Sequence, residues 1–321
     1  MVRFGILGTA RIAEAFLREK PETACITAIA SRDGNRAREF ARRAGLTSWF
    51  GSYEDLLADP AIDAVYIPLP PAMHCEYTVK ALEAGKHVLV EKPAGLTVGE
   101  VERMQAAARA AGVRVMECLM YRFLRVHRRA LEILREGTIG KLQAVDFRWA
   151  SNLDLLARSP FRLDPAQGGG AMYDLGIYGI DFLRLVTGGE PRVLHAAQRR
   201  RGDAGVDDLV MATLSVNDVI ATIGCGFRMD ANYYLLAGET GSITSPIALS
   251  GRYSPRELHI HQLGEDRRWV EQFEPENPYS AGLEYFASCI VQAVGPQPGL
   301  DNAARNLSLL TRILSVAEEL D

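Results

Sequence analysis

The chain has 321 residues, a formal net charge of −4 and 48% hydrophobic residues. That length exceeds one ordinary hydrophobic core, so two domains of a soluble globular protein are expected. The weak negative charge leaves no basic footprint and argues against nucleic acid as the main partner. The sequence has no apolar run near the ~20 residues of a membrane span, so no membrane partner is expected.

Five cysteines are scattered along the chain, without a CxxC pair and without histidines at metal-ligand spacing. No metal site is therefore expected. Most of these cysteines lie in apolar segments, which predicts buried, reduced thiols in a reducing compartment. The first strand-like run, VRFGIL, starts at residue 2 and leaves no room for a signal peptide, so we expect a cytoplasmic protein.

From residue 1 to about 120, short apolar runs alternate with helical patterns. The strand-like runs are VRFGIL, CITAIA, AVYI, HVLV and VRVMEC. Helices are expected from about Ala10 and over residues 35–44, 73–84 and 98–111. This alternation predicts right-handed βαβ units and a doubly wound parallel sheet covered by helices on both faces. We therefore expect an α/β Rossmann domain over residues 1–121.

After Tyr121 the pattern changes to an amphipathic helix, residues 125–136, followed by runs with strand character. These runs are KLQAVDFRWAS, VLHAAQRR, DLVMATLSV, VIATIGCGF, YYLLAG and LHIHQLG. Asn217-Asp218 and residues 238–241 supply turn chemistry between them. The pattern predicts an antiparallel sheet of five or six strands. Helices over 281–293 and 302–320 complete an α+β domain over residues 122–321.

The first strand-like run leads into Gly8-Thr9-Ala10-Arg11-Ile12-Ala13. A dinucleotide fingerprint has G-x-G-x-x-G/A here, for a tight turn, close approach of the pyrophosphate and close helix packing. Gly8 and Ala13 fit the first and third glycine positions. Ala10 adds a methyl group at the second but leaves the backbone N–H donors in place. The location favours a nucleotide site over a plain strand-to-helix turn.

The end of the second strand-like run bears on the choice between NAD and NADP. An acidic residue about 20 residues after the fingerprint would bind the ribose 2′-hydroxyl of NAD. The chain has Ser31-Arg32-Asp33 here and Arg36 one helical turn later. Hydroxyl and guanidinium groups suit the 2′-phosphate of NADP, which is therefore favoured. Asp33 remains able either to accept the ribose hydroxyl or to cap the next helix.

The segment GGGAMYDLGIYGID, residues 168–181, predicts a helix with two different sides. Asp174, Tyr178 and Asp181 are four and three residues apart, which stacks them on one side. Another side has the apolar period of a core-facing helix and carries Met172, Leu175, Gly179, Phe182 and Val186. The first side is either a solvated face or a functional one, and Asp181 is left out of the predicted site.

Motifs along essentially the whole chain resemble one family. They are GTARIA, SRD, IPLPPAMH, EKP, FRLDPAQGGGAMYDLGIY and Asn277-Pro278-Tyr279. The pair EKP and GGGxxxDxGxY is specific, and with it the chain resembles the glucose–fructose oxidoreductase and inositol dehydrogenase family, called Gfo/Idh/MocA. The resemblance implies a Rossmann domain followed by an α+β domain with a large, mostly antiparallel open sheet. That sheet would make homodimer or homotetramer contacts.

Many members of the family have histidine where this chain has Tyr178. Histidine titrates near neutral pH, whereas tyrosine titrates near ~10 and needs assistance from its surroundings. The tyrosine indicates the branch of NADP-dependent aldose dehydrogenases, dihydrodiol dehydrogenase and sugar-ketone reductases.

Carried onto this sequence, the resemblance implies a set of cofactor-binding residues. Those of the phosphate loop are Gly8, Thr9, Ala10, Arg11 and Ile12, and those at the 2′-phosphate are Ser31, Arg32 and Arg36. After strands four and five they are Leu69, Pro70, His74, Glu91 and Lys92. Later in the chain they are Phe161, Arg162 and Tyr279, although phenylalanine stands where the family often has tryptophan.

The resemblance also implies that Lys92 and the helix of Asp174 and Tyr178 meet at the nicotinamide. Tyr178 is the predicted acid and base: as phenolate it accepts the substrate's hydroxyl proton, and as phenol it returns one. A nearby Lys92 would favour the phenolate by its positive charge. Asp174 would bind and orient a substrate hydroxyl. Arg122, which follows the last Rossmann strand, is a further candidate for substrate contact.

The leading hypothesis is an NADP-dependent oxidoreductase of a sugar or polyol, with Lys92, Asp174 and Tyr178 as catalytic residues. One alternative is a reductase of nucleotide-linked keto-sugars, which shares the lysine and tyrosine chemistry. Another is a non-catalytic NADP sensor or scaffold. The presence of all three residues argues against the sensor, because a sensor could lose them without penalty.

Overall fold

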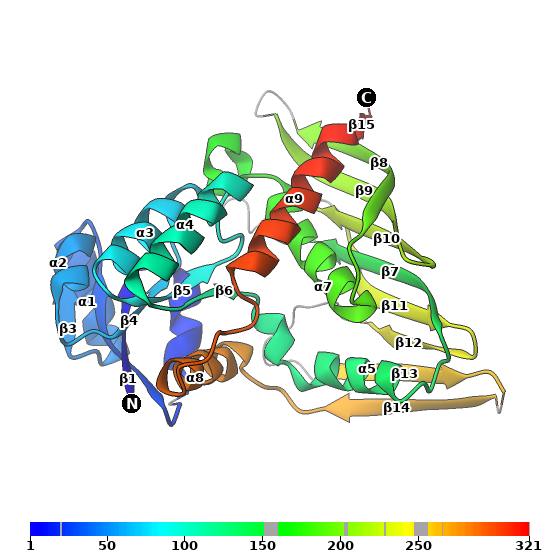
Figure 1. The fold of residues 1–321 in the computed structure, drawn as a ribbon, viewed down its shortest axis with the longest axis horizontal. Helices are drawn as coiled ribbons and strands as arrows, with labels where there is room; N and C mark the ends of the chain where they lie inside the picture. Colours follow the sequence, from blue (N-terminus) through cyan, green and yellow to red (C-terminus); the bar gives the residue numbers. More distant parts are fainter. Residues whose placement is uncertain are drawn as a thin grey trace. The chain divides into compact units, whose positions relative to one another are not determined.

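The computed structural model describes residues 1–19, 21–150, 160–201, 205–227, 229–246, 256–264 and 266–320. Contacts group the chain into two compact units (Figure 1). The first comprises Met1–Met120 with Asn277–Arg305, and the second Tyr121–Glu276 with Asn306–Asp321. A late segment of the chain therefore packs with the N-terminal residues. Domain limits of 1–121 and 122–321 stay a prediction from the sequence.

The first unit is built on a six-stranded parallel sheet in the order β3-β2-β1-β4-β5-β6. Its strands are β1 (Val2–Leu7), β2 (Ala24–Ala30), β3 (Ser48–Phe50), β4 (Ala64–Ile67), β5 (His87–Glu91) and β6 (Val115–Cys118). The order reverses direction between β1 and β4, as in dinucleotide-binding folds. The predicted Rossmann sheet is confirmed, and β4 is buried along its whole length because helices cover such sheets on both faces.

Helices surround this sheet. They are α1 (Gly34–Ala44), α2 (Tyr53–Ala58), α3 (His74–Glu83), α4 (Val98–Ala111) and α8 (Pro278–Val291). The helix expected from Ala10 is instead a 3₁₀ helix, η1 (Arg11–Leu17). Strand β3 and helix α2 were not predicted, because their three and six residues are too few to show a period.

The second unit contains a nine-stranded sheet, so the expected five or six strands were too few. Its order is β14-β13-β12-β11-β7-β10-β9-β8-β15. Antiparallel pairs predominate, with parallel pairing of β10 to β7 and of β15 to β8. The strands are β7 (Leu142–Ala150), β8 (Arg192–Arg201), β9 (Val206–Val216), β10 (Val219–Gly226), β11 (Asn232–Gly238), β12 (Gly241–Ser245), β13 (Arg256–Gln262), β14 (Arg267–Phe273) and β15 (Glu318–Glu319).

Turn residues behave as predicted in this sheet. Asn217, between β9 and β10, adopts a left-handed conformation with φ 52°. Gly238 and Gly241 pair with each other across the turn between β11 and β12.

The helical segments of the second unit include a π-helical turn, η6 (Met172–Gly176), that runs directly into α7 (Ile177–Thr187). The others are η3 (Met120–Phe123), α5 (Arg125–Arg135), η4 (Pro160–Leu163), η5 (Pro165–Gln167) and α9 (Leu300–Val316). Helix α9 begins in the first unit and ends in the second. Helix α7 packs on β7 and β10, and α5 packs on β13 (Figure 1).

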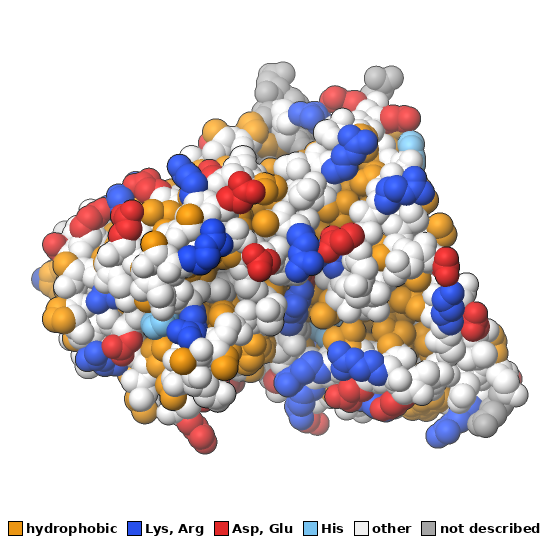
Figure 2. All heavy atoms as spheres, in the orientation of Figure 1, with side chains coloured by type: hydrophobic (Ala, Val, Ile, Leu, Met, Phe, Trp, Pro, Cys, Tyr) orange, Lys and Arg blue, Asp and Glu red, His pale blue; other side chains and the backbone are white. Residues whose placement is uncertain are grey.

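All five cysteines are free thiols, four of them buried and Cys25 half-buried, as the composition predicts. No helix among the described residues is long and apolar enough to cross a membrane. The face of the molecule in Figure 2 has acidic and basic side chains interspersed with hydrophobic ones.

The packing of α7 on the sheet predicts the effect of Gly179→Ala. A Cβ at this position would lie 2.6 Å from Phe147 Cδ1 and 2.9 Å from Ile223 Cγ2. Helix propensity favours alanine by about 1 kcal/mol, whereas overpacking costs roughly 1–3 kcal/mol. We expect a net loss of about 1 kcal/mol in the free energy of unfolding, measured by urea denaturation. Gly99→Ala in α4 is the control, since nothing lies within 4 Å of its Cβ position. Equal effects of the two substitutions would contradict this explanation.

Candidate functional site

The loop after β1 requires glycine at its first position. Gly8 has φ +105°, a conformation that side chains of L-residues rarely adopt, and its N–H donates to the carbonyl of Ala30 at 2.8 Å. A Cβ here would also lie 2.9 Å from Leu69 Cδ2. Ala10 is extended and accepts a hydrogen bond from the N–H of Ala13 at 3.0 Å, which opens η1. The predicted fingerprint thus forms a tight strand-to-helix turn.

One of the two roles left open for Asp33 is seen in the structure. Its carboxylate caps α1 by accepting from the N–H groups of Asn35 at 2.9 Å and Arg36 at 3.3 Å. The N–H of Asp33 donates to the hydroxyl of Ser31 at 3.2 Å. The capping role is therefore present in the structure, while Arg32 and Arg36 are exposed.

Tyr53, at the start of α2, lies beside the Arg32 guanidinium. Burial raises the pKa of Tyr53, and the Arg32 charge opposes that rise. The Arg32 charge therefore lies close to the Tyr53 hydroxyl at the end of β2.

His74 joins the loops that follow β4 and β5. The ring is fully buried, with Nδ1 2.7 Å from the carbonyl oxygen of Pro93 and Nε2 2.7 Å from that of Leu69. Burial lowers the pKa of His74, while the two carbonyl contacts oppose that effect. Because the imidazole has no exposed surface in the first unit, its contribution is to fix the two loops relative to each other.

Glu91, the last residue of β5, has both carboxylate oxygens engaged. The Tyr66 hydroxyl donates to Oε1 at 2.7 Å, and the N–H of Lys92 donates to Oε2 at 3.2 Å. Burial, reinforced by the Glu91 charge, raises the pKa of Tyr66 well above its ordinary value, so this phenol stays protonated. Glu91 thereby fixes the backbone from which Lys92 projects.

Tyr279 also belongs to the first unit. Its ring lies 5.1 Å from that of Phe16 in an edge-on arrangement, and its N–H donates to Asn277, the N-cap of α8. Asn277 in turn donates to the carbonyl of Ala15 at 2.8 Å. The late tyrosine is therefore anchored to η1, the helix that follows the glycine loop.

The predicted cofactor residues of the first unit follow the carboxyl ends of neighbouring parallel strands. Gly8 follows β1, Ser31 follows β2, Leu69 follows β4, and Lys92 follows β5. Ligands of open α/β sheets bind at this edge, where the strand order reverses. The residues predicted from the sequence to bind the cofactor therefore lie at the edge of the sheet where the strand order predicts a ligand.

In the second unit, Asp174 lies in the π-helical turn and pairs with Arg162. The Arg162 Nε is 2.6 Å from Asp174 Oδ2, and the two side chains are 21% and 12% exposed. The guanidinium also lies over the Phe161 ring, 4.8 Å from its centroid. Phe161, Arg162 and Asp174 thus form one cluster, although the first two were predicted to bind the cofactor and Asp174 to bind the substrate.

Tyr178 is half-buried on α7, four residues after Asp174. Its ring centroid lies 4.4 Å from that of Trp149 on β7 and 6.1 Å from that of Tyr121. Trp149 is absent from the predicted site, although its place on an alternating strand indicated either a core residue or a platform for a sugar ring. Its contact with Tyr178 shows that the Trp149 side chain lies on the face of β7 that packs against α7.

Asp181, which follows Tyr178 by three residues and was left out of the predicted site, is fully buried. Its carboxylate accepts hydrogen bonds from Tyr121 Oη at 2.5 Å, Arg122 Nε at 2.8 Å, Arg122 Nη2 at 2.5 Å and Asn306 Nδ2 at 2.9 Å. Burial alone would lower the pKa of Arg122, but the Asp181 charge raises it above the ordinary value. At least two Arg122 nitrogens are thus committed to Asp181.

Asp207, at the start of β9, also bears on this helix and was not predicted. It is 6% exposed, and its Oδ2 accepts the N–H of Met172 at 2.7 Å. Burial raises the pKa of Asp207 to about 6. The only sequence signal is the pair Asp207-Asp208 in an otherwise apolar strand, where a buried acid is unusual.

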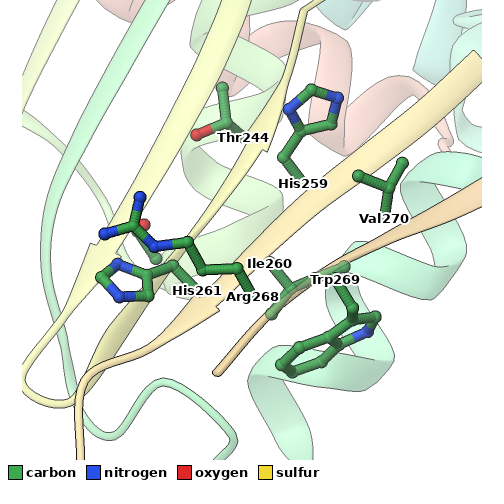
Figure 3. Close-up of a pocket in the computed structure, with 8 residues that line it drawn as sticks. Thr244, His259, Ile260, His261, Arg268, Trp269 and Val270 are labelled. Atoms are coloured by element: carbon green, nitrogen blue, oxygen red, sulfur yellow. The ribbon is translucent and has the colours of Figure 1, made fainter. Parts of the chain in front are cut away.

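A hollow of about 400 Å³ lies on the sheet of the second unit (Figure 3). It is lined from β12, β13 and β14 by Ser242, Thr244, His259, Ile260, His261, Arg268, Trp269 and Val270. None of the predicted site residues lines it, so the residues with the expected chemistry lie elsewhere. Among the described residues, no group of His, Cys, Asp or Glu side chains is arranged to hold a metal ion.

The strand order, the glycine loop and the polar residues at the strand ends define a dinucleotide-binding oxidoreductase fold. Residues 2–118 match the family described as the GFO/IDH/MocA oxidoreductase family with an NAD-binding Rossmann fold. Residues 127–244 match the GFO/IDH/MocA C-terminal domain. The chain belongs to this oxidoreductase family, as its motifs predict.

Curated relatives and solved structures are similar over most of the chain. Human trans-1,2-dihydrobenzene-1,2-diol dehydrogenase is 33% identical over 89% of this chain and 86% of its own. A D-xylose 1-dehydrogenase (NADP(+)) of Haloferax volcanii is 32% identical over 98% and 97%. A 3-ketoreductase from Actinomadura kijaniata, solved with NADP and TDP-benzene, has a TM-score of 0.91 and 28% identity over 99% and 98%. Some other curated relatives align over only 64% of their length.

The buried carboxylate predicts a large stability loss for Asp181→Ala. The substitution would leave the Arg122 guanidinium buried without that carboxylate, which costs about 3–5 kcal/mol. The control is Asp218→Ala, since Asp218 pairs with Lys141 at 2.7 Å but both side chains are exposed. Exposed pairs contribute little to stability, because water and salt screen their charges. Chemical denaturation of both variants tests the difference, and a loss below about 1 kcal/mol for Asp181→Ala would contradict the assignment.

Proposed function

We propose that the protein is an NADP-dependent oxidoreductase that transfers a hydride between the nicotinamide and a hydroxyl or carbonyl group of a sugar or polyol. The Arg162–Asp174 ion pair carries the proposal. It is charged and partly exposed, its Asp174 lies four residues before Tyr178, and the chain belongs to a family of oxidoreductases. Relatives named for diol and NADP-linked xylose oxidation support the substrate class.

The first unit fits a dinucleotide phosphate. A side chain at Gly8 would fill the space in which the loop turns, and Thr9, Ala10, Arg11 and Ile12 follow it at the N-terminus of η1. Arg32 and Arg36 are exposed at the end of β2, beside Ser31, and would bind the 2′-phosphate. Leu69, Pro70, Glu91 and Lys92 complete the edge, with His74 fixing two of its loops. When bound, the cofactor supplies the hydride chemistry.

In this proposal, Tyr178 holds or releases the proton of the substrate's reacting hydroxyl. Its phenolate accepts the proton in oxidation, and its phenol donates one in reduction. The positive charge of Lys92 assists by favouring the phenolate. Asp174 accepts a hydrogen bond from a second substrate hydroxyl, and its ion pair with Arg162 orients the Asp174 carboxylate.

The remaining predicted contacts are refined by the geometry. Arg162 pairs with Asp174 and its guanidinium lies over the Phe161 ring, so both residues support Asp174 in addition to their proposed contact with the cofactor. Arg122 serves chiefly to neutralise Asp181, so its direct role in substrate binding is the weakest of the proposed contacts. Tyr279 remains a proposed cofactor contact, held close to the glycine loop by Asn277.

We also propose that the outward face of the nine-stranded sheet joins copies of the chain into a homodimer or homotetramer. Phe147 and Ile223 face α7, so residues that alternate with them face away from it. Large apolar side chains are exposed on this sheet at Met211, Ile220 and Val270, with exposed fractions of 36%, 49% and 48%. A monomeric mass by light scattering would contradict this assembly.

Replacing the tyrosine hydroxyl tests the function directly. Tyr178→Phe should lower turnover at least a hundredfold, because proton transfer by a positioned group contributes about 10²–10⁴-fold. The measurement is reduced-nicotinamide absorbance with NADP⁺ and a panel of aldoses, inositols and 1,2-diols. Tyr233→Phe is the control. The Tyr233 hydroxyl, on β11 of the same unit, donates to the Asp146 carboxylate on β7 at 2.8 Å. Full activity of Tyr178→Phe would remove this residue from the mechanism.

The cofactor assignment predicts a selective effect of Arg32→Ala. Loss of a charge-assisted hydrogen bond costs about 1.5–3 kcal/mol, so KM for NADP⁺ should rise roughly ten- to a hundredfold while KM for NAD⁺ stays nearly constant. Arg38→Ala, an exposed arginine further along α1, should change neither. A wild-type preference for NAD⁺ would overturn the assignment.

A second candidate is the reduction of nucleotide-linked keto-sugars. It is favoured by the similarity to the 3-ketoreductase solved with NADP and TDP-benzene. Turnover that requires a diphosphate-linked substrate would establish it. NADPH binding without turnover of free or nucleotide-linked sugars would instead indicate a sensor or scaffold.

A further inference from the structure

The Asp207 carboxylate lies against the turn that opens the helix of Asp174 and Tyr178. It accepts the N–H of Met172, the first residue of the π-helical turn. It also occupies the space next to Gly170, where any Cβ would overlap Asp207 Oδ1. Gly170 has φ +113°, so the backbone conformation and the neighbouring carboxylate both require glycine.

Gly170 is linked to both partners of the Arg162–Asp174 pair. Its N–H donates to the Arg162 carbonyl at 2.9 Å, and its own carbonyl accepts from the N–H of Asp174 at 3.1 Å. The side chains of these two residues pair at 2.6 Å. Any shift of the turn at Gly170 therefore moves both ends of the ion pair.

Burial disfavours the ionised form of Asp207. Its pKa, raised by burial to about 6, lies above the ordinary value of 3.8, so stability is greatest when the group is protonated and falls as the pH rises through about 6. Arg200 on β8 and the N–H of Met172 favour the ionised form, whereas the neighbouring Asp208 opposes it. Cys225 on β10 and Asp174 in the turn are the other titratable groups nearby. Costly buried charges of this kind are typical of functional sites.

We propose that Asp207 is a positioning residue: by holding Gly170 and Met172 it maintains the π-helical turn that sets Asp174 relative to Tyr178. The inference rests on the proposed function, in which these two residues bind the substrate and move its proton. A π-helical turn contains one residue more than an α-helical turn. Its relaxation to α-helix would change the angle about the helix axis between Asp174 and Tyr178.

The test compares Asp207→Ala, Gly170→Ala and Asp207→Asn with the control Asp208→Asn. Asp208 is the adjacent buried acid, but it pairs with Arg199 at 2.8 Å rather than with the turn. NADP⁺ with D-xylose and with trans-1,2-dihydrobenzene-1,2-diol are the probes. We expect kcat to fall ten- to a hundredfold in the first two variants, with little change in NADP⁺ binding, since small misplacements cost about that much. Asp207→Asn keeps an oxygen acceptor for Met172 and should lose less than fivefold, consistent with rescue.

Two further readouts separate positioning from general stability. The melting temperature of the wild type should rise between pH 8 and pH 5 relative to Asp207→Asn, which has no carboxylate to protonate. Asp207→Ala with a melting temperature like that of Asp208→Asn, yet with kcat within twofold of wild type, would overturn the inference.

If the wild type turns over neither probe, the proposed function fails while the inference stays testable. Hydrogen–deuterium exchange of the peptide spanning residues 170–178 then decides it. Exchange at least tenfold faster in Asp207→Ala and Gly170→Ala, but not in Asp208→Asn, would support the positioning role. Unchanged exchange would overturn it.

Discussion

The second unit depends on one buried carboxylate, that of Asp181. It is fully buried on α7 and accepts hydrogen bonds from Tyr121, Arg122 and Asn306, which belong to two segments far apart in the sequence. Burying a carboxylate costs several kcal/mol unless a charge and further donors compensate, and here both are present. Because Asp181 is three residues after Tyr178, the same bonds that neutralise the acid also fix the tyrosine's helix to the start of the unit and to α9.

Three carboxylates hold this helix, and their different environments correspond to different tasks. Asp181 is neutralised by an arginine and provides anchorage, while Asp174 is paired with Arg162 but keeps some exposure and can meet a ligand. Asp207 is bonded to Met172 and has a raised pKa, so its ionised form reduces stability at neutral pH. The unit therefore accepts one costly charge close to the residues proposed to handle the substrate's proton, where strain is most often retained.

Local signals made the first unit predictable. Alternating apolar runs and helical periods, with Gly8 after the first run, are short-range features, and the six-stranded parallel sheet follows from them. Strands β12 and β14 were missed because five or seven mostly polar residues show little alternation. The buried state of Asp181 could not be predicted, because helical spacing groups it with Asp174 and its partners Arg122 and Asn306 are distant in sequence. Such long-range polar pairing overrides the local period.

Asp33, which follows β2, supports one conclusion by the sequence rule and another by its contacts in the structure. By sequence rule, an acid here indicates NAD, because a carboxylate accepts from the ribose hydroxyls. Asp33 is such an acid, but its carboxylate accepts from the N–H groups of Asn35 and Arg36 and so completes the first turn of α1. Both N–H groups donate to Oδ1 of this carboxylate, and its negative charge is partly offset by the helix N-terminus. Arg32 and Arg36 are exposed beside it, and these two cations are the basis of the 2′-phosphate site proposed above.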